Sequence, residues 1–140
     1  MARLRSLVFT ALFASSAVVA EPLLSCGAAN YFPSQYTCDE GFLCPIVDGT
    51  PYIKCGNDCY TLTEFTCFDN SLNPPVNPNG PVIPIWCGDF HFFDPSVVVC
   101  FDDGFFCPIV DGNATFPCGD TCFTPSESYC DLGQIFPLDS

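Results

Sequence analysis

The six residues CPIVDG at positions 44–49 recur without change at positions 107–112. Cysteines surround both copies in the same order. Successive cysteines are separated by 11, 5, 10, 3 and 7 residues around the first copy and by 12, 6, 10, 3 and 7 around the second. An identical hexapeptide inside matched cysteine spacing indicates a duplicated module. The sequence therefore predicts two tandem cysteine-rich modules of roughly 45 residues each.

Each module also contains a weaker repeat of its own. A Cys-Gly pair opens each of four segments, an aromatic residue follows, and Pro-Ser comes two residues later in three of them. The opening cysteines are Cys26, Cys55, Cys87 and Cys118; the aromatic residues are Tyr31, Tyr60, Phe93 and Phe123; the closing cysteines are Cys38, Cys67, Cys100 and Cys130. We interpret every module as two related halves.

The cysteine content predicts a disulfide scaffold made in an oxidising compartment. All twelve cysteines lie after residue 20, and the four that do not open or close a half are Cys44, Cys59, Cys107 and Cys122. Six cysteines in a module permit many pairings. The half-repeat favours Cys26–Cys38 and Cys55–Cys67, which leaves Cys44–Cys59 to join the halves.

The expected fold class is small, disulfide-rich and mainly β or irregular, with short strands and turns. Asp48-Gly49 and Asp111-Gly112 are typical of type I′ hairpin turns, because these residues tolerate positive φ angles. Residues 69–84 are rich in proline and asparagine and favour an extended spacer without strand pairing. We therefore expect two modules with separate cores. The expected boundaries are 1–20 for a signal peptide, 21–68 for the first module, 69–84 for the linker and 85–140 for the second module.

Residues 1–20 have the features of a secretory signal peptide. Arg3 and Arg5 precede an apolar run that ends in small residues and is shorter than the about 20 apolar residues that span a bilayer. We expect cleavage after Ala20 and a secreted protein, extracellular or in the cell wall. Residues 21–140 keep one basic residue, Lys54, and all sixteen acidic residues, a formal charge of −15. Clusters of Lys and Arg bind phosphate backbones, so neither nucleic acid nor membrane is an expected partner.

Patterns for catalysis or metal binding are weak. The one histidine, His91, has no counterpart in the first module. Acidic residues gather in turns; a glycosidase pair among them stays open, but a module of this size seldom encloses a substrate cleft. Asp102 and Asp103 lack the spacing of a calcium loop, and the two Cys-x3-Cys pairs lack the regular knuckles of a zinc site. We expect no enzyme, no metal and no cofactor.

Aromatic residues at repeat-matched positions point to a neutral glycan as ligand. An aromatic face offers a large contact area at low entropy cost, and tyrosine adds a polar tip, which suits the C–H face and hydroxyl edge of a sugar. The candidate carbohydrate-binding residues are Tyr31, Tyr36, Tyr60, Phe65, Phe93 and Phe123. A small module must also build its core from aromatic residues, and we expect about half of them there, chiefly Phe42 and Phe105.

These motifs resemble a known family. The pattern runs from Cys26-Gly27 through PSQYTC at residues 33–38 and GFLCPIV at residues 41–47 to Cys59-Tyr60. It closely resembles a fungal carbohydrate-binding domain of endo-1,3(4)-β-glucanases, of the type called carbohydrate-binding module family 52, and covers nearly all of residues 26–68. The resemblance implies non-catalytic binding of β-1,3-glucan. The family's domain accompanies a large catalytic domain that these 140 residues do not contain, so its hydrolase activity is not expected here.

The second module departs from the pattern. Val98 stands at the position of Tyr36, and Ser128 stands at the position of Phe65, with Tyr129 one place further on. If Tyr36 and Phe65 touch sugar, the second module should bind more weakly or bind something different. Its sequon at Asn113 predicts an N-glycan at an exposed hairpin tip.

Two other functions stay open. The chain could be a secreted cysteine-rich effector or inhibitor whose aromatic residues contact another secreted or wall protein. It could also be a structural wall component cross-linked through an unpaired thiol. Our first hypothesis remains a binder of neutral wall glucan in which two weak sites act together.

Overall fold

The computed structural model describes residues 20–77, 79–81, 85–88, 91–101 and 104–138. This part of the chain consists of strands and turns and contains no helix, which confirms the small, disulfide-rich β class. It accordingly includes no helix of the length and apolarity that a membrane span requires. The expected signal peptide, apart from Ala20, and the Asp102-Asp103 pair lie outside the described residues.

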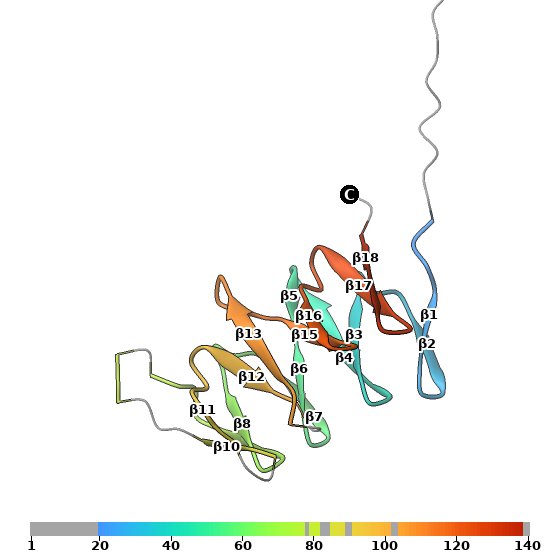
Figure 1. Ribbon diagram of the computed structural model, residues 1–140. Coiled ribbons are helices and arrows are strands. Elements are labelled where there is room, and N and C mark those ends of the chain that lie inside the picture. Colours follow the sequence, from blue (N-terminus) through green and yellow to red (C-terminus); the bar gives the residue numbers. More distant parts are fainter. Residues whose placement is uncertain (1–19, 78, 82–84, 89–90, 102–103, 139–140) are drawn as a thin grey trace, which may run out of the picture.

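The strands form four similar units, each made of two successive antiparallel hairpins (Figure 1). The first unit, residues 24–51, contains β1 (Leu24–Cys26), β2 (Ala29–Tyr31), β3 (Tyr36–Asp39), β4 (Phe42–Val47) and β5 (Thr50–Pro51). The second, residues 53–73, contains β6 (Ile53–Cys55), β7 (Asp58–Tyr60), β8 (Thr66–Phe68) and β9 (Ser71–Asn73). The third, residues 85–114, contains β10 (Ile85–Cys87), β11 (His91–Phe93), β12 (Val98–Cys100), β13 (Phe106–Val110) and β14 (Asn113–Ala114). The fourth, residues 116–137, contains β15 (Phe116–Cys118), β16 (Thr121–Phe123), β17 (Ser128–Asp131) and β18 (Gln134–Pro137).

The repeated turn residues set the hairpin geometry. Asp48 and Gly49 have φ angles of 50° and 76° between β4 and β5, and Val47 pairs with Thr50 across them. Two positive φ angles in a two-residue loop define a type I′ turn. Asp111 and Gly112 repeat this turn in the second module, with φ angles of 51° and 77°. The prediction of type I′ turns is therefore confirmed.

The glycine of the Cys-Gly pair has a second role. Gly27 has a φ of 59°, and a Cβ placed on it would lie 3.2 Å from the carbonyl oxygen of Gly41. The turn of the first hairpin therefore rests against the turn of the second. This close approach of backbone to backbone explains why the pair recurs at the start of the units.

All twelve cysteines are paired as the half-repeat predicts. The bonds are Cys26–Cys38, Cys44–Cys59, Cys55–Cys67, Cys87–Cys100, Cys107–Cys122 and Cys118–Cys130. Each unit has one bond between its two hairpins, and one further bond in each module joins its two units. No cysteine is free, so the hypothesis of a wall component cross-linked through an unpaired thiol loses its basis.

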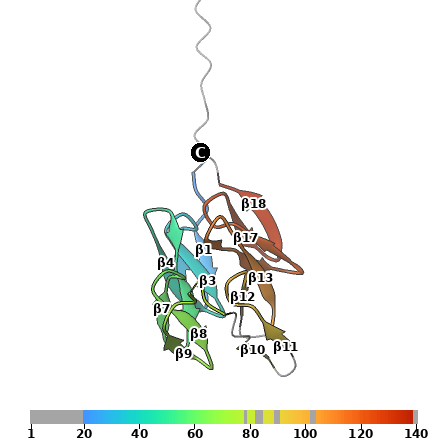
Figure 2. The same ribbon diagram turned by 90° about the vertical axis from the view of Figure 1, so that its left-hand side faces the viewer.

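The expectation of two modules with separate cores is wrong. The modules lie side by side as two columns that run in opposite directions, so that β1 and β18 lie at the same end (Figures 1 and 2). One hydrophobic cluster spans both of them. It contains Ile53, Cys55 and Tyr60 from the first module and Val99, Phe101, Cys107, Ala114 and Phe116 from the second. A module of this size buries too little apolar surface alone, and each column covers the apolar face of the other.

The expected linker is also more structured than its composition indicates. Ser71–Asn73 forms β9, which pairs with β8 through a turn at Asp69 and Asn70. Both turn residues have positive φ angles, near 50° and 54°, and Asp and Asn tolerate this conformation better than most residues. The proline-rich part therefore begins only after the last hairpin of the second unit.

Candidate functional site

A groove lies where the first unit faces the fourth. We call it the tyrosine groove and define it by Tyr31, Tyr36, Phe123, Tyr129 and Asp131. Apolar, small polar, cysteine and proline residues also line it, among them Leu24, Phe116 and Leu132. Its volume is about 260 Å³, below the roughly 300–1,000 Å³ of pockets that enclose a small ligand. A hollow of this size suits one part of a polymer that continues across the surface.

The hairpins of the two modules set the rings of this groove. Tyr31 ends β2 and is half-buried, whereas Tyr36 begins β3 and is 40% exposed. From the opposite side, Tyr129 of β17 stacks on Phe136 of β18, with ring centroids 5.4 Å apart and planes inclined by 23°. Because each module supplies tyrosines to one wall, the groove exists only when the two modules are packed together.

Phe123 connects the groove to the shared core. Its ring packs against Phe116, with centroids 6.3 Å apart, and Phe116 packs in turn against Phe101 at 5.6 Å. Phe116 belongs to the shared core and also lines the groove. Through Phe116, the rings of the groove are therefore continuous with the buried cluster.

One carboxylate faces the phenols. Burial raises the pKa of Tyr31 above 10.0, and the negative charge of Asp131 raises it further. Tyr31 therefore stays protonated at neutral pH and can donate a hydrogen bond, while the carboxylate of Asp131 can accept one. Within the described part of the chain, no basic side chain lines the groove. This set of donors and acceptors fits hydroxyl groups and offers nothing that would attract an anion.

A second hollow adjoins the tyrosine groove. It has a volume of about 320 Å³ and is lined by Ala20, Glu21, Pro22, Ser34, Tyr129, Pro137 and Leu138. Tyr129 lines both hollows. The two hollows therefore meet at the ring of Tyr129.

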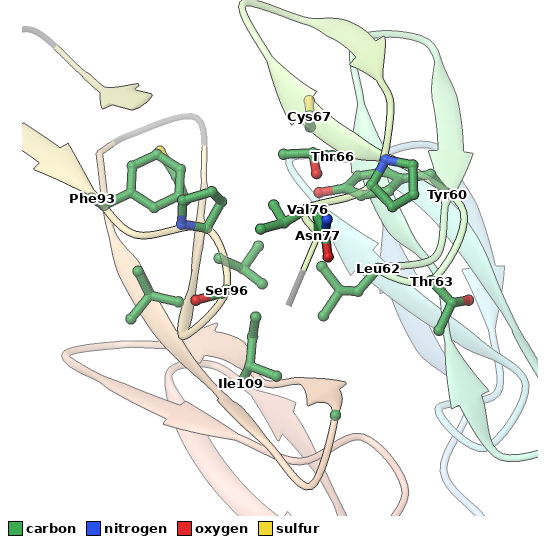
Figure 3. A pocket seen from close by; sticks show the side chains of 16 residues that line it. Tyr60, Leu62, Thr63, Thr66, Cys67, Val76, Asn77, Phe93, Ser96 and Ile109 are labelled. Carbon is green, nitrogen blue, oxygen red and sulfur yellow. The ribbon is translucent and has the colours of Figure 1, made fainter. Parts of the chain in front are cut away.

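A different groove lies where the second unit faces the third, and Figure 3 shows it from close by. We call it the apolar groove and define it by Tyr60, Leu62, Phe93, Val98 and Val99. Val76 and Asn77, which follow β9, form part of its wall. Its volume is about 640 Å³, and none of its lining residues is charged. Burial raises the pKa of Tyr60 to about 12, so this phenol belongs to the core rather than to an exposed face.

The structure divides the six candidate residues into three groups. Tyr31, Tyr36 and Phe123 meet in the tyrosine groove. Phe65 is 40% exposed but lines neither groove. Tyr60 and Phe93 line the apolar groove yet are only 4% and 8% exposed, so the expectation that they offer a stacking face does not fit their burial.

The expected core residues also differ from the observed ones. Phe42 and Phe105 are only half-buried, although Phe105 does pack against the core cluster. Among the residues whose burial is described, the buried aromatic side chains are Tyr60, Phe93, Phe101 and Phe116. Three of these lie in the second module, and Tyr60 belongs to the same buried cluster as two of them, Phe101 and Phe116. The prediction placed the core inside each module, whereas the core lies largely between the modules.

Sequence reasoning did not select Tyr129 and Asp131 as site residues. They belong to the fourth unit, 93 to 100 residues from the tyrosines that they face, and no motif connects them to Tyr31 or Tyr36. One signal for Tyr129 was present in the sequence: the aromatic residue near the last cysteine of each module is Phe65 in the first and lies one position later, at Tyr129, in the second. Its meaning depends on which units face each other.

The structure adds little on catalysis. His91 lies in β11, but its side chain lies outside the described part of the structure. Within the described ranges, no three acidic, histidine or cysteine side chains gather in a way that could hold a metal ion.

Asn113 is exposed directly after the Asp111-Gly112 turn, and its glycosylation stays a prediction.

A family model described as carbohydrate binding matches the chain twice, over residues 25–72 and 86–135. The matches cover well over half of the chain and correspond to the first two and the last two units. No curated protein and no solved structure matches.

Proposed function

We propose, because this chain belongs to the carbohydrate-binding family, that it is a non-catalytic binder of neutral cell-wall polysaccharide and that its preferred ligand is β-1,3-glucan. The family membership supports carbohydrate as the ligand. The preference for β-1,3-glucan rests on the resemblance of residues 26–68 to the glucan-binding domains of fungal glucanases. The six disulfides and the apolar N-terminal segment support secretion.

We place the binding site in the tyrosine groove. Its convergence of Tyr31, Tyr36 and Tyr129 from two modules is the observation that carries this proposal. Ring faces contact the C–H face of a sugar, while the carboxylate of Asp131 accepts hydrogen bonds from hydroxyl groups. An uncharged ligand also matches a protein with a formal charge of −15 over residues 21–140, because binding then requires no cationic surface.

The chain offers a matched pair of variants to test the site. Tyr36 and Phe65 occupy equivalent places in the first and second units and are equally exposed, but only Tyr36 lines a groove. Tyr36→Ala should reduce retention on insoluble β-1,3-glucan about tenfold, which corresponds to about 1.4 kcal/mol. Phe65→Ala should leave retention unchanged.

Retention should be insensitive to salt, because stacking on a neutral sugar involves no counterions. Equal retention on cellulose and chitin would contradict a preference for glucan. Equal losses for Tyr36→Ala and Phe65→Ala would show that the tyrosine groove is not the site.

The apolar groove supports the second candidate, a secreted effector or inhibitor of another protein. An uncharged, partly open surface rimmed by polar residues is typical of a protein contact. A protein partner would respond to changes at Val98 and Leu62 and remain indifferent to Tyr36→Ala. Glucan binding predicts the reverse.

A further inference from the structure

The turn that joins the two hairpins has the same hydrogen bonds in all four units. The backbone N–H groups of its fourth and fifth residues donate to the carbonyl oxygen of its first. The first residues are Phe32, Thr61, Asp94 and Thr124. In the first unit, Gln35 N and Tyr36 N lie 2.9 and 3.2 Å from the carbonyl oxygen of Phe32. This pattern is a single helical turn, and it leaves the N–H group of the third residue without a backbone acceptor.

The third unit satisfies that N–H with a local cap. Oδ1 of Asp94 accepts hydrogen bonds from Ser96 N at 2.9 Å and from Ser96 Oγ at 2.6 Å. These bonds, from the hydroxyl first and the backbone second, lower the pKa of Asp94 below its ordinary value. Asp, Asn, Ser and Thr are the usual caps because a short side chain reaches its own turn.

The first unit lacks such a residue, because Phe32 occupies the capping position. A carboxylate from outside the turn takes the role instead. Ser34 N donates to Oε1 of Glu21 at 2.6 Å, and Ser34 Oγ donates to Oε2 at 2.8 Å. The two donors on Ser34 are those that Ser96 uses in the third unit. Only the origin of the acceptor differs.

The capped turn supports the tyrosine groove. Tyr31 immediately precedes the turn and Tyr36 is its last residue, so the turn sets how the two rings stand relative to each other. We infer that Glu21 is a positioning residue of the tyrosine groove, and this inference rests on the proposed function. Glu21 is also the first residue expected after signal-peptide cleavage, which makes the mature N-terminus a structural part of the site.

The test uses the chain of residues 21–140 with its disulfides formed. Glu21→Ala should raise the hydrogen-exchange rate of the Ser34 amide about tenfold, the size expected for a lost cap. It should also weaken retention on β-1,3-glucan roughly three- to tenfold, since the rings lose their fixed spacing. The pKa of Tyr31 should fall toward its ordinary value, because the loosened turn exposes its phenol to water.

Two further variants separate positioning from direct contact. Glu21→Ala combined with Phe32→Asp restores a local acceptor at the place of Asp94, and it should recover both Ser34 protection and retention. Asp94→Ala removes the equivalent cap beside the apolar groove and should leave retention unchanged.

Each failure has a distinct meaning. An unchanged Ser34 exchange rate in Glu21→Ala would overturn the cap, and unchanged retention would overturn the positioning role. A double variant that recovers Ser34 protection without retention would show that Glu21 contacts the glycan itself, which also overturns positioning. If the parent chain is not retained on glucan, the proposed function fails, while Ser34 exchange still decides whether Glu21 holds the turn.

Discussion

The tyrosine groove and the apolar groove occupy equivalent places in a duplicated architecture. In the alignment of the two modules, the first unit is equivalent to the third and the second unit is equivalent to the fourth. The pair of units that forms the tyrosine groove therefore corresponds to the pair that forms the apolar groove. Position by position, Tyr31 corresponds to Phe93, Tyr36 to Val98, Thr37 to Val99, Tyr129 to Thr66 and Asp131 to Phe68. Four of the five exchanges lose a polar group entirely, and only the exchange of Tyr129 for Thr66 keeps a hydroxyl. Four of the five counterparts line the apolar groove, whereas Phe68 does not.

Thr37 and Val99 show how the difference extends below the surface. Both are buried in the same place of their hairpins. The hydroxyl of Thr37 donates toward the carbonyl oxygens of Cys44 and Tyr52, at 3.3 and 3.1 Å. Val99 instead packs into the shared core beside Phe101. The same backbone therefore accommodates a polar wall in one groove and a hydrophobic wall in the other.

Within this chain, the two modules share the scaffold more closely than they share the residues that face the grooves. Disulfides, type I′ turns and the capped turns are kept in both modules, while the residues that face the grooves are not. A duplicated scaffold with one polar and one apolar groove predicts one glycan site per chain. Substitutions in the core and in each groove test that asymmetry.

Phe116→Ala should have the largest effect, because it removes a core ring that both modules share. The ring is 2% exposed and touches Phe101 and Phe123. We expect the free energy of unfolding to fall by about 3–5 kcal/mol. Trp86, the one tryptophan, reports on the third unit by fluorescence, and circular dichroism reports on the whole chain. The two probes should show one common unfolding transition. Separate transitions would mean that the modules unfold independently, and the two grooves could then not be treated as parts of one cooperative structure.

Alkaline pH should lower the free energy of unfolding through the ionisation of Tyr60, which lines the apolar groove. Its folded-state pKa of about 12 lies above the ordinary value of 10.0. A raised pKa means that stability is intact below pH 10 and is lost as the pH rises from 10 to 12, by about 3 kcal/mol for the full shift. Tyr60→Phe should remove most of this loss when denaturant midpoints are compared at about pH 9 and about pH 11. An identical pH dependence in the variant would show that Tyr60 is not the buried phenol responsible.

The apolar groove should gain glycan binding if it receives the residues of its counterpart. The variant carries Val98→Tyr, Thr66→Tyr and Phe68→Asp. Two glycan sites on one rigid molecule should raise retention on insoluble β-1,3-glucan about tenfold through avidity. The melting temperature of the variant serves as the control for folding. A folded variant without any gain would mean that these three positions do not explain the difference between the grooves.

Asp131→Asn should have the smallest effect. It removes the charge that faces Tyr31 but keeps a hydrogen-bond acceptor. The pKa of Tyr31 should fall and still remain above 10.0, because burial is the larger cause of its shift. Retention should fall about threefold, the size of one weakened hydrogen bond. Ultraviolet titration of the phenol and the retention assay measure the two effects separately. A rise in the pKa of Tyr31 would contradict the contact between the two groups.

Much of the local structure could be predicted from the sequence. The half-repeat identified the correct disulfide pairs, since cysteines at equal separations in similar hairpins meet in similar ways. Asp48-Gly49 and Asp111-Gly112 identified two turns, because only a few residues tolerate two positive φ angles in succession. Three of the six candidate aromatic residues also line the tyrosine groove, since the repeat marked their positions.

The contacts between the modules could not be predicted in the same way. The prolines after residue 73 indicated a spacer, yet the modules pack against each other around Ile53, Val99 and Phe116. Tyr129 joins Tyr31, and Glu21 joins Ser34, only through folding that brings distant segments together.

The sequence by itself determined the repeat, the disulfide framework, the turns and the carbohydrate-binding family, because each depends on residues close together in the chain or on a pattern that recurs. The tertiary structure alone decided which rings are buried and which face a groove. The physical reason is that a small module cannot bury its apolar face alone. Its core, and with it the choice of residues left for a ligand, depends on the surface of the other module, which no local pattern describes.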